Sequence, residues 1–180
     1  DVYKRQALAE LATGHLKGVT NGAALVLGSG LGGGIIINGK LFQGSHFQAG
    51  ELTFLLPLQM EKLDPSLMQE TTLSAIGLIT KVNEILASLD LKDGLLAFKA
   101  INAKKEAVYP IFETYCRNLA ITILNLQTIF DMETFVLGGG ISAQSILIEE
   151  VNRQFDKVHH EIDFIGKIIK RPKIVACHHN

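Results

Sequence analysis

The sequence predicts an α/β domain built on a mixed sheet. Two apolar, β-branched runs flank a glycine cluster, and the second run ends at Asn38-Gly39, a pair typical of tight β-hairpins. Further along, a strand, a helix and a last strand form a crossover, a connection that normally joins parallel strands. Together these observations indicate one sheet with both strand directions and with helices packed on it.

Each element follows from the apolar pattern. Strands are expected where apolar and β-branched residues run together, at 23–27, 34–37, 40–43, 134–137 and 173–177. Helices are expected where apolar residues recur every three or four positions, at 7–13, 65–89, after Asp93, at 104–130 and at 142–159. Pro110 fits the first turns of the longest helix, and Ser142 is the expected N-cap of the last one.

Composition narrows the class of partner. With 47% hydrophobic residues, the 180-residue chain has enough apolar material for one sizeable core. Its 17 Lys and Arg nearly balance 18 Asp and Glu, and no basic stripe occurs, which favours a small-molecule partner over nucleic acid or an anionic membrane. Cys116 and Cys177 lie far apart outside any CxxC pattern, which argues against a disulfide framework and fits a cytoplasmic setting.

The glycine cluster lies in VLGSGLGGGIIINGK, residues 26–40, and contains a GxGxxG pattern at Gly28, Gly30 and Gly33. A dinucleotide fingerprint requires a helix directly after the glycines, whereas a β-branched run and an Asn-Gly turn follow here. A flexible turn is the plain alternative. The third interpretation is a phosphate loop on a hairpin, because backbone N–H groups and the Ser29 hydroxyl can face an anion without obstruction by side chains.

Further motifs accompany this hairpin: ALAE at 7–10, AGE at 49–51 and FVLGGGIS at 135–142. Together they resemble the ROK family of repressors, open reading frames and sugar kinases. In that family ALAE ends the NDANxAALAE run with the catalytic base, the hairpin binds phosphate, AGE begins the sugar-binding AGExxH motif, and GGGIS contacts adenosine. The resemblance covers nearly all of residues 7–180. It implies a lobe of the actin-like ATPase (ribonuclease H-like) fold, with an N-terminal β-hairpin in a mixed sheet and packed helices.

The resemblance implies an ATP-dependent sugar kinase similar to zinc-free glucokinases, fructokinases or β-glucoside kinases. An aspartate would deprotonate a hexose or hexoside hydroxyl for attack on the γ-phosphoryl group, while Mg²⁺ and loop amides stabilise the transferred charge. The implied contacts are Gly28, Ser29, Gly30, Gly32 and Gly33 for phosphate, Gly138, Gly139 and Gly140 for adenosine, and Glu51 and His46 for the sugar. Without the family context, Glu51 and His46 are ordinary loop side chains.

The chain departs from the family pattern at two positions. The catalytic aspartate aligns with Val2, so the base is missing. Phe54 stands where AGExxH has its histidine, and no CxCGxxGC run follows, so no zinc is expected. The departure at Phe54 leaves the sugar open. The adjacent pairs His159-His160 and His178-His179 suggest a metal site, but neighbouring residues on a helix point about 100° apart, so neither pair has the i, i+4 spacing of metal ligands. Both pairs are therefore expected to be solvated.

The expected organisation is a non-native leader at 1–6 followed by a partial C-terminal kinase domain at 7–180, cut at both ends. The leader, DVYKRQ, resembles a translated sequencing adaptor. Such a piece would be inactive. One alternative is the sugar-sensing domain of a ROK repressor, the one case with a nucleic-acid partner, and another is a non-catalytic sugar- or nucleotide-binding module. The apolar stripe at 104–130 is expected to be core or to contribute to a homodimer.

Overall fold

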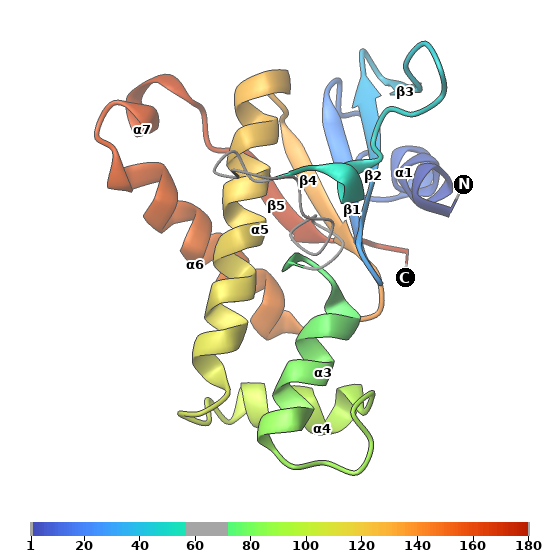
Figure 1. The fold of residues 1–180 in the computed structure, drawn as a ribbon. Helices are drawn as coiled ribbons and strands as arrows, with labels where there is room; N and C mark the ends of the chain where they lie inside the picture. Colours follow the sequence, from blue (N-terminus) through green and yellow to red (C-terminus); the bar gives the residue numbers. More distant parts are fainter. Residues whose placement is uncertain (1, 57–71, 180) are drawn as a thin grey trace.

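The computed structural model describes residues 2–56 and 72–179, and these form a five-stranded mixed sheet with helices on both faces (Figure 1). The strand order is β3-β2-β1-β4-β5. The strands are β1 (Gly22–Leu27), β2 (Leu31–Ile37), β3 (Lys40–Phe42), β4 (Thr134–Gly138) and β5 (Lys173–Ala176). β1, β2 and β3 pair antiparallel, whereas β4 runs parallel to both β1 and β5. The predicted mixed sheet is therefore confirmed.

Helices divide between the two faces of the sheet. Their bounds are α1 (Val2–Thr13), α3 (Ala75–Ile85), α4 (Gly94–Asn102), α5 (Tyr109–Phe130), α6 (Ser145–Glu161) and α7 (Ile165–Ile168), with a 3-10 turn η1 at Leu52–Phe54. α1 covers one face, and α5 and α6 cover the other (Figure 1). Successive residues of each strand face opposite sides of the sheet, so they contribute alternately to two hydrophobic cores, one on each side. On β1, for example, Ala24 joins the smaller core under α1, while Ala23 and Leu25 join the larger one.

α1 begins earlier than the sequence pattern indicates. Residues 7–13 are the end of a helix, as the pattern indicates, and that helix starts at Val2. Tyr3 explains the extension: its ring lies where a side chain on Gly32 would be, with a Cβ there only 2.2 Å from the ring. Tyr3 is thus packed on the sheet, and whether residues 1–6 are native stays a prediction.

The predicted Asn-Gly turn, the helix after Asp93 and the place of Pro110 are confirmed. Asn38 (φ 52°) and Gly39 (φ 70°) both have positive φ, as a type I′ turn requires. Asp93 caps α4, since its side chain accepts a hydrogen bond from the Leu96 N–H at 2.9 Å. Pro110 lies in the first turn of α5, where its missing N–H costs no helix hydrogen bond.

Three predicted helix starts need correction. The helix expected at 65–89 is interrupted, because Ser74 has extended backbone angles and caps a new helix at Ala75; residues 57–71 lie outside the described part. The helix expected from 104 begins at Tyr109. Ser142 is not an N-cap: its hydroxyl donates to the Gly139 carbonyl at 2.8 Å. A further turn, in which the Gln144 N–H donates to the Ile141 carbonyl at 3.1 Å, separates Ser142 from α6, and that helix starts at Ser145.

The histidine pairs differ from expectation at one position. His159 is only 4% exposed, its ring stacks on Phe155, and its Nε2 lies 2.6 Å from the Ile169 carbonyl oxygen. It is therefore a buried contact between α6 and the chain after α7, not a solvated residue. His160 and His178 are exposed as expected.

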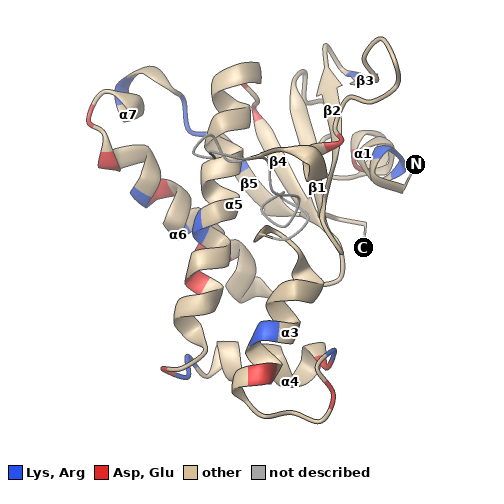
Figure 2. Cartoon of the chain, viewed as in Figure 1, with Lys and Arg blue, Asp and Glu red and all other residues tan. Residues whose placement is uncertain are grey.

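Charge is mixed over the described surface. Figure 2 shows residues of both signs on α6, where Glu149 and Glu150 are followed by Arg153. Within the described ranges, no helix is both long and apolar enough to cross a membrane.

Candidate functional site

The turn that contains Gly28 and the turn that contains Gly139 lie side by side at the same end of the sheet. β1 and β4 are parallel neighbours, with Val26 opposite Gly138, so the chain leaves both strands at the same edge. Contact is close: a Cβ on Gly139 would lie 2.1 Å from the Leu27 carbonyl oxygen. Residues 28–30 and 138–140 therefore form one centre at the carboxyl ends of parallel strands, where open α/β sheets commonly bind ligands.

The glycines at this centre include two with free space above them. A Cβ on Gly28 or on Gly140 would meet no heavy atom within 4 Å. The backbone of Gly28 is already engaged, because its N–H donates to the Gly30 carbonyl (3.0 Å) and its carbonyl accepts from the Ala75 N–H (2.8 Å). Within the described part of the chain, the N–H groups of Ser29 and Gly30 have no such partner. The candidate anion donors are therefore these two N–H groups and the Ser29 hydroxyl; Ser29 is exposed, whereas Gly30 is buried.

The remaining glycines of the cluster serve packing. The expected loop through Gly33 is too long, because β2 begins at Leu31 and contains Gly32 and Gly33. A Cβ on Gly33 would lie 2.8 Å from a methyl carbon of Leu52. Like Gly32 under Tyr3, this glycine lets another segment approach the strand, so neither is needed as part of an open loop.

Packing on β2 brings the AGE motif to the same region. Gly50 has φ +89°, and a Cβ on it would lie 2.2 Å from the Gly33 carbonyl oxygen. Glu51 follows directly, and one of its carboxylate oxygens lies 4.0 Å from Lys4 Nζ on the first turn of α1. Lys4 also donates to the Phe47 carbonyl. The start of α1 and the loop with Glu51 are therefore held together.

Other predicted residues occupy the same end of α1 or the same loop. Val2 opens α1, is 70% exposed and has no group that can take a proton. His46 is exposed on the loop before Glu51, and their joint contact with a sugar stays a prediction. Phe54, 62% exposed, ends η1.

Within the described residues, no group of three or more His, Cys, Asp or Glu side chains could hold a metal ion. Cys177 lies beside Gly138, with its sulfur 2.9 Å from where a Cβ would be. Burial, reinforced by the nearby Glu10 carboxylate, raises the pKa of Cys177 to about 12. This thiol therefore stays protonated at neutral pH, which disfavours a role as a nucleophile.

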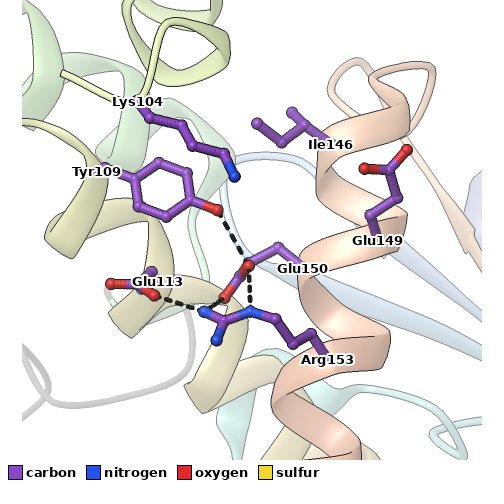
Figure 3. A pocket seen from close by; sticks show the side chains of 7 residues that line it. All are labelled: Lys104, Tyr109, Glu113, Ile146, Glu149, Glu150 and Arg153. Atoms are coloured by element: carbon purple, nitrogen blue, oxygen red, sulfur yellow. Dashed lines mark hydrogen bonds and ion pairs between the residues drawn. The ribbon is translucent and has the colours of Figure 1, made fainter.

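A pocket that the sequence did not indicate lies between α5 and α6 (Figure 3). Its volume is about 440 Å³, and it is lined by Lys104, Tyr109, Glu113, Ile146, Glu149, Glu150 and Arg153. Glu150 is the centre: it accepts from Tyr109 OH (3.1 Å) and from Arg153 Nε (2.8 Å) and Nη2 (2.5 Å). Gln154 donates to the same carboxylate at 2.7 Å. Most polar groups here form hydrogen bonds with one another, so the cluster holds α5 against α6.

The hydrogen bonds decide the charge state of this cluster. Burial alone would raise the pKa of Glu150, but the hydrogen bonds from Arg153, Gln154 and Tyr109 outweigh it and hold that pKa below its usual value. Burial and the Glu150 carboxylate raise the pKa of Tyr109 to about 12. Glu150 is therefore ionised and Tyr109 neutral at pH 7.

We expect Glu150→Gln to lower the free energy of unfolding at pH 7 by about 1–3 kcal/mol, because charge-assisted hydrogen bonds are lost. Since the folded pKa lies below the unfolded one, the contribution of ionised Glu150 is complete above the unfolded value and disappears as pH falls through the folded value. Urea unfolding of both proteins at pH 7 and near pH 3 measures this. If the difference in free energy of unfolding between the parent and Glu150→Gln is no smaller near pH 3 than at pH 7, Glu150 is not the ionised acceptor described above.

The sequence of this chain is similar to sequences of known proteins. The ROK family model matches residues 3–165. An N-acetyl-D-glucosamine kinase from Vibrio cholerae is 30% identical over 190 residues, which cover 96% of this chain and 59% of that kinase. The chain thus spans about three fifths of that relative's length.

Solved structures share the fold. A ROK family protein from Streptococcus pneumoniae in complex with sucrose superposes with a TM-score of 0.81 at 28% identity, covering 98% of this chain and 58% of that one. A ROK glucokinase from Streptomyces griseus in complex with glucose and AMPPNP gives 0.81 at 20% identity, covering 97% and 61%. A ROK transcriptional regulator, a homologue of the E. coli MLC protein, gives 0.73 at 22% identity, covering 97% and 46%.

Proposed function

This chain belongs to the ROK family and has the actin-like ATPase fold of its structural neighbours, and we propose that it forms the nucleotide- and sugar-contacting lobe of an ATP-dependent sugar kinase. The observation that carries the proposal is the arrangement along β2. The phosphate donors at Ser29 and Gly30 precede that strand, and Gly33 within it holds the turn that ends at Glu51. A sugar at Glu51 and a phosphate at the loop would then share one side of the fold.

The nucleotide is proposed to bind where the glycine turns meet. Its phosphates would accept hydrogen bonds from the Ser29 and Gly30 N–H groups and from the Ser29 hydroxyl. Adenosine would lie against residues 138–140, where Gly140 leaves open space. Mg²⁺ normally accompanies ATP through the phosphates and one or two carboxylates. No group of three or more His, Cys, Asp or Glu side chains gathers in the described part of the chain, and we assign the ion no residue and no step.

The sugar is proposed to be a hexose or a hexoside. Glu51 can accept hydrogen bonds from neighbouring hydroxyls, and His46 on the same loop can donate or accept one. Val2 cannot remove the proton from the attacking hydroxyl. We therefore expect sugar and nucleotide binding without turnover from the 180 residues alone.

Phosphorylation of a sugar panel by the full-length protein tests this function. With ATP and glucose, fructose, N-acetylglucosamine or a β-glucoside, we expect one sugar to be phosphorylated. Glu51→Ala should then reduce kcat/KM about 10- to 100-fold, because polar groups of the bound sugar lose a partner. Glu106→Ala removes an exposed glutamate far from this loop and is the matched control. No turnover with any sugar despite an intact base would refute the kinase proposal, whereas equal effects of the two substitutions would refute the contact between Glu51 and the sugar.

Two other functions keep a specific observation in their favour. The regulator of the same fold supports a sugar-sensing repressor domain, which would require a DNA-binding helix-turn-helix encoded upstream. Val2 and Phe54 support a non-catalytic binding module, which would bind sugar without phosphorylating it. A homodimer through exposed α5 residues such as Ile129, and a cytoplasmic location, are proposals that rest on family membership.

A further inference from the structure

The start of α3 is joined directly to the proposed phosphate loop. Ser74 is buried, with 8% exposed, and its hydroxyl accepts a hydrogen bond from the Gly77 N–H at 2.9 Å, which caps the helix. The next residue, Ala75, donates its N–H to the Gly28 carbonyl at 2.8 Å. One of the free N–H groups at this helix end therefore bonds to the loop, and the cap fixes its direction.

This contact determines which way the loop's anion donor points. The Gly28 carbonyl and the Ser29 N–H belong to the same peptide unit, and no described peptide bond is cis. In a trans peptide, the C=O and N–H bonds point in opposite directions. Because the Gly28 carbonyl is held on α3, the Ser29 N–H must point away from that helix. Rotation of this single peptide would turn a carbonyl oxygen toward the anion and repel it.

Neighbouring elements hold the helix start in place. Tyr115 of α5, which is buried, donates its hydroxyl to the Leu73 carbonyl at 3.1 Å, one residue before the cap. At the other end of α3, buried Asn83 donates to the Asp93 carbonyl at 2.9 Å and ties α3 to α4. The position of the Ala75 N–H is thus fixed by side chains outside the loop.

We propose that Ser74 is a positioning residue for phosphate binding: by capping α3, it holds the Ala75 N–H on the Gly28 carbonyl and so aims the Ser29 N–H at the nucleotide's phosphates. This rests on the proposed function, because the anion is the phosphate of the nucleotide. Ser74 itself does not touch the ligand. A cap that only stabilised its helix would have no preference between ligands with and without phosphate.

The test compares ADP with adenosine, measured by titration calorimetry on the 180-residue chain. Ser74→Ala should weaken ADP binding roughly fivefold, the usual effect of losing a serine cap, and leave adenosine binding unchanged. Ser74→Thr keeps a capping hydroxyl and should restore ADP affinity. Asp93→Ala removes the equivalent cap of α4, whose bond to Leu96 N–H has the same 2.9 Å length, and should change neither affinity. Equal losses for both ligands in Ser74→Ala, or the same loss in Asp93→Ala, would overturn the proposal.

A measurement without ligand separates this proposal from the proposed function. Hydrogen exchange of the Ala75 amide should be roughly fivefold faster in Ser74→Ala than in the parent and unchanged in Asp93→Ala. If ADP does not bind the parent but this exchange pattern appears, the nucleotide function fails while the positioning contact stands. If the Ala75 amide exchanges equally in all three proteins, Ser74 does not hold the loop, whatever binds there.

Discussion

Replacing Gly139 by alanine is expected to lower the free energy of unfolding by about 3 kcal/mol or more. Two costs add at this position. Its φ of +97° is a backbone conformation that costs residues with a Cβ about 1–3 kcal/mol. The added Cβ would also lie 2.1 Å from the Leu27 carbonyl oxygen, a backbone atom that no side-chain rotation can move. Urea unfolding followed by far-UV circular dichroism measures the loss, since the chain has no Trp for fluorescence.

Gly140→Ala is the matched control, because its Cβ would meet no heavy atom within 4 Å and its φ is not in the positive range. We expect its stability to stay within about 0.5 kcal/mol of the parent, as for a surface substitution. Its methyl group would instead occupy the open space where adenosine is proposed, so nucleotide binding should weaken. Equal destabilisation by the two substitutions would contradict the close approach of the two glycine turns.

Elements set by neighbouring residues could be predicted from the sequence. The Asn38-Gly39 turn requires two positive φ angles in succession, which few residue pairs other than Asn-Gly adopt readily. Asp93 caps α4 through an amide three residues away. In both cases every atom that decides the conformation lies within a few positions along the chain.

The sequence alone could not show which glycines of the cluster form the loop and which lie in the following strand. Gly28 and Gly32 look alike in the sequence, yet Gly28 leaves open space while Gly32 lies under the Tyr3 ring. The difference comes from α1, which is separated from these glycines by a strand and a turn. Spacing therefore indicated a glycine loop but placed its end too late, and it did not show that the glycines of β2 admit neighbouring segments.

Polar residues near helix ends show the same limit. Ser142 has the composition of an N-cap, but the turns that follow the triple glycine use its hydroxyl before the helix begins. His159 has the position of a solvated helix end, but the chain after α7 returns and covers it. Sequence patterns give the preference of each residue, whereas tertiary contact decides which partner it finds.

Glu10 is the clearest example of a residue whose role depends on remote contact. It is completely buried on α1 and is the last residue of the family motif ALAE. One side-chain oxygen accepts from the His15 N–H (2.9 Å), and the other accepts from the His179 N–H (2.8 Å) in the segment after β5. Gln6 donates to the His179 carbonyl, so that segment is held to α1 through both groups of one residue. The carboxyl group thus closes the small core between α1 and the sheet.

Glu10→Ala is accordingly expected to lower the free energy of unfolding by about 3 kcal/mol, because the half-buried N–H groups of His15 and His179 lose their acceptor at about 1–3 kcal/mol each. Glu10→Gln keeps one acceptor oxygen and should cost about half as much. Glu161→Ala, which removes an exposed carboxylate paired with Arg117 at 2.8 Å, is the control and should cost less than about 1 kcal/mol. Amide exchange at His179 should accelerate with the loss of stability in the Glu10 variants alone. If Glu10→Ala were no more destabilising than Glu161→Ala, apolar contacts alone would hold α1 on the sheet. The buried carboxyl group would then contribute nothing to the stability of the small core.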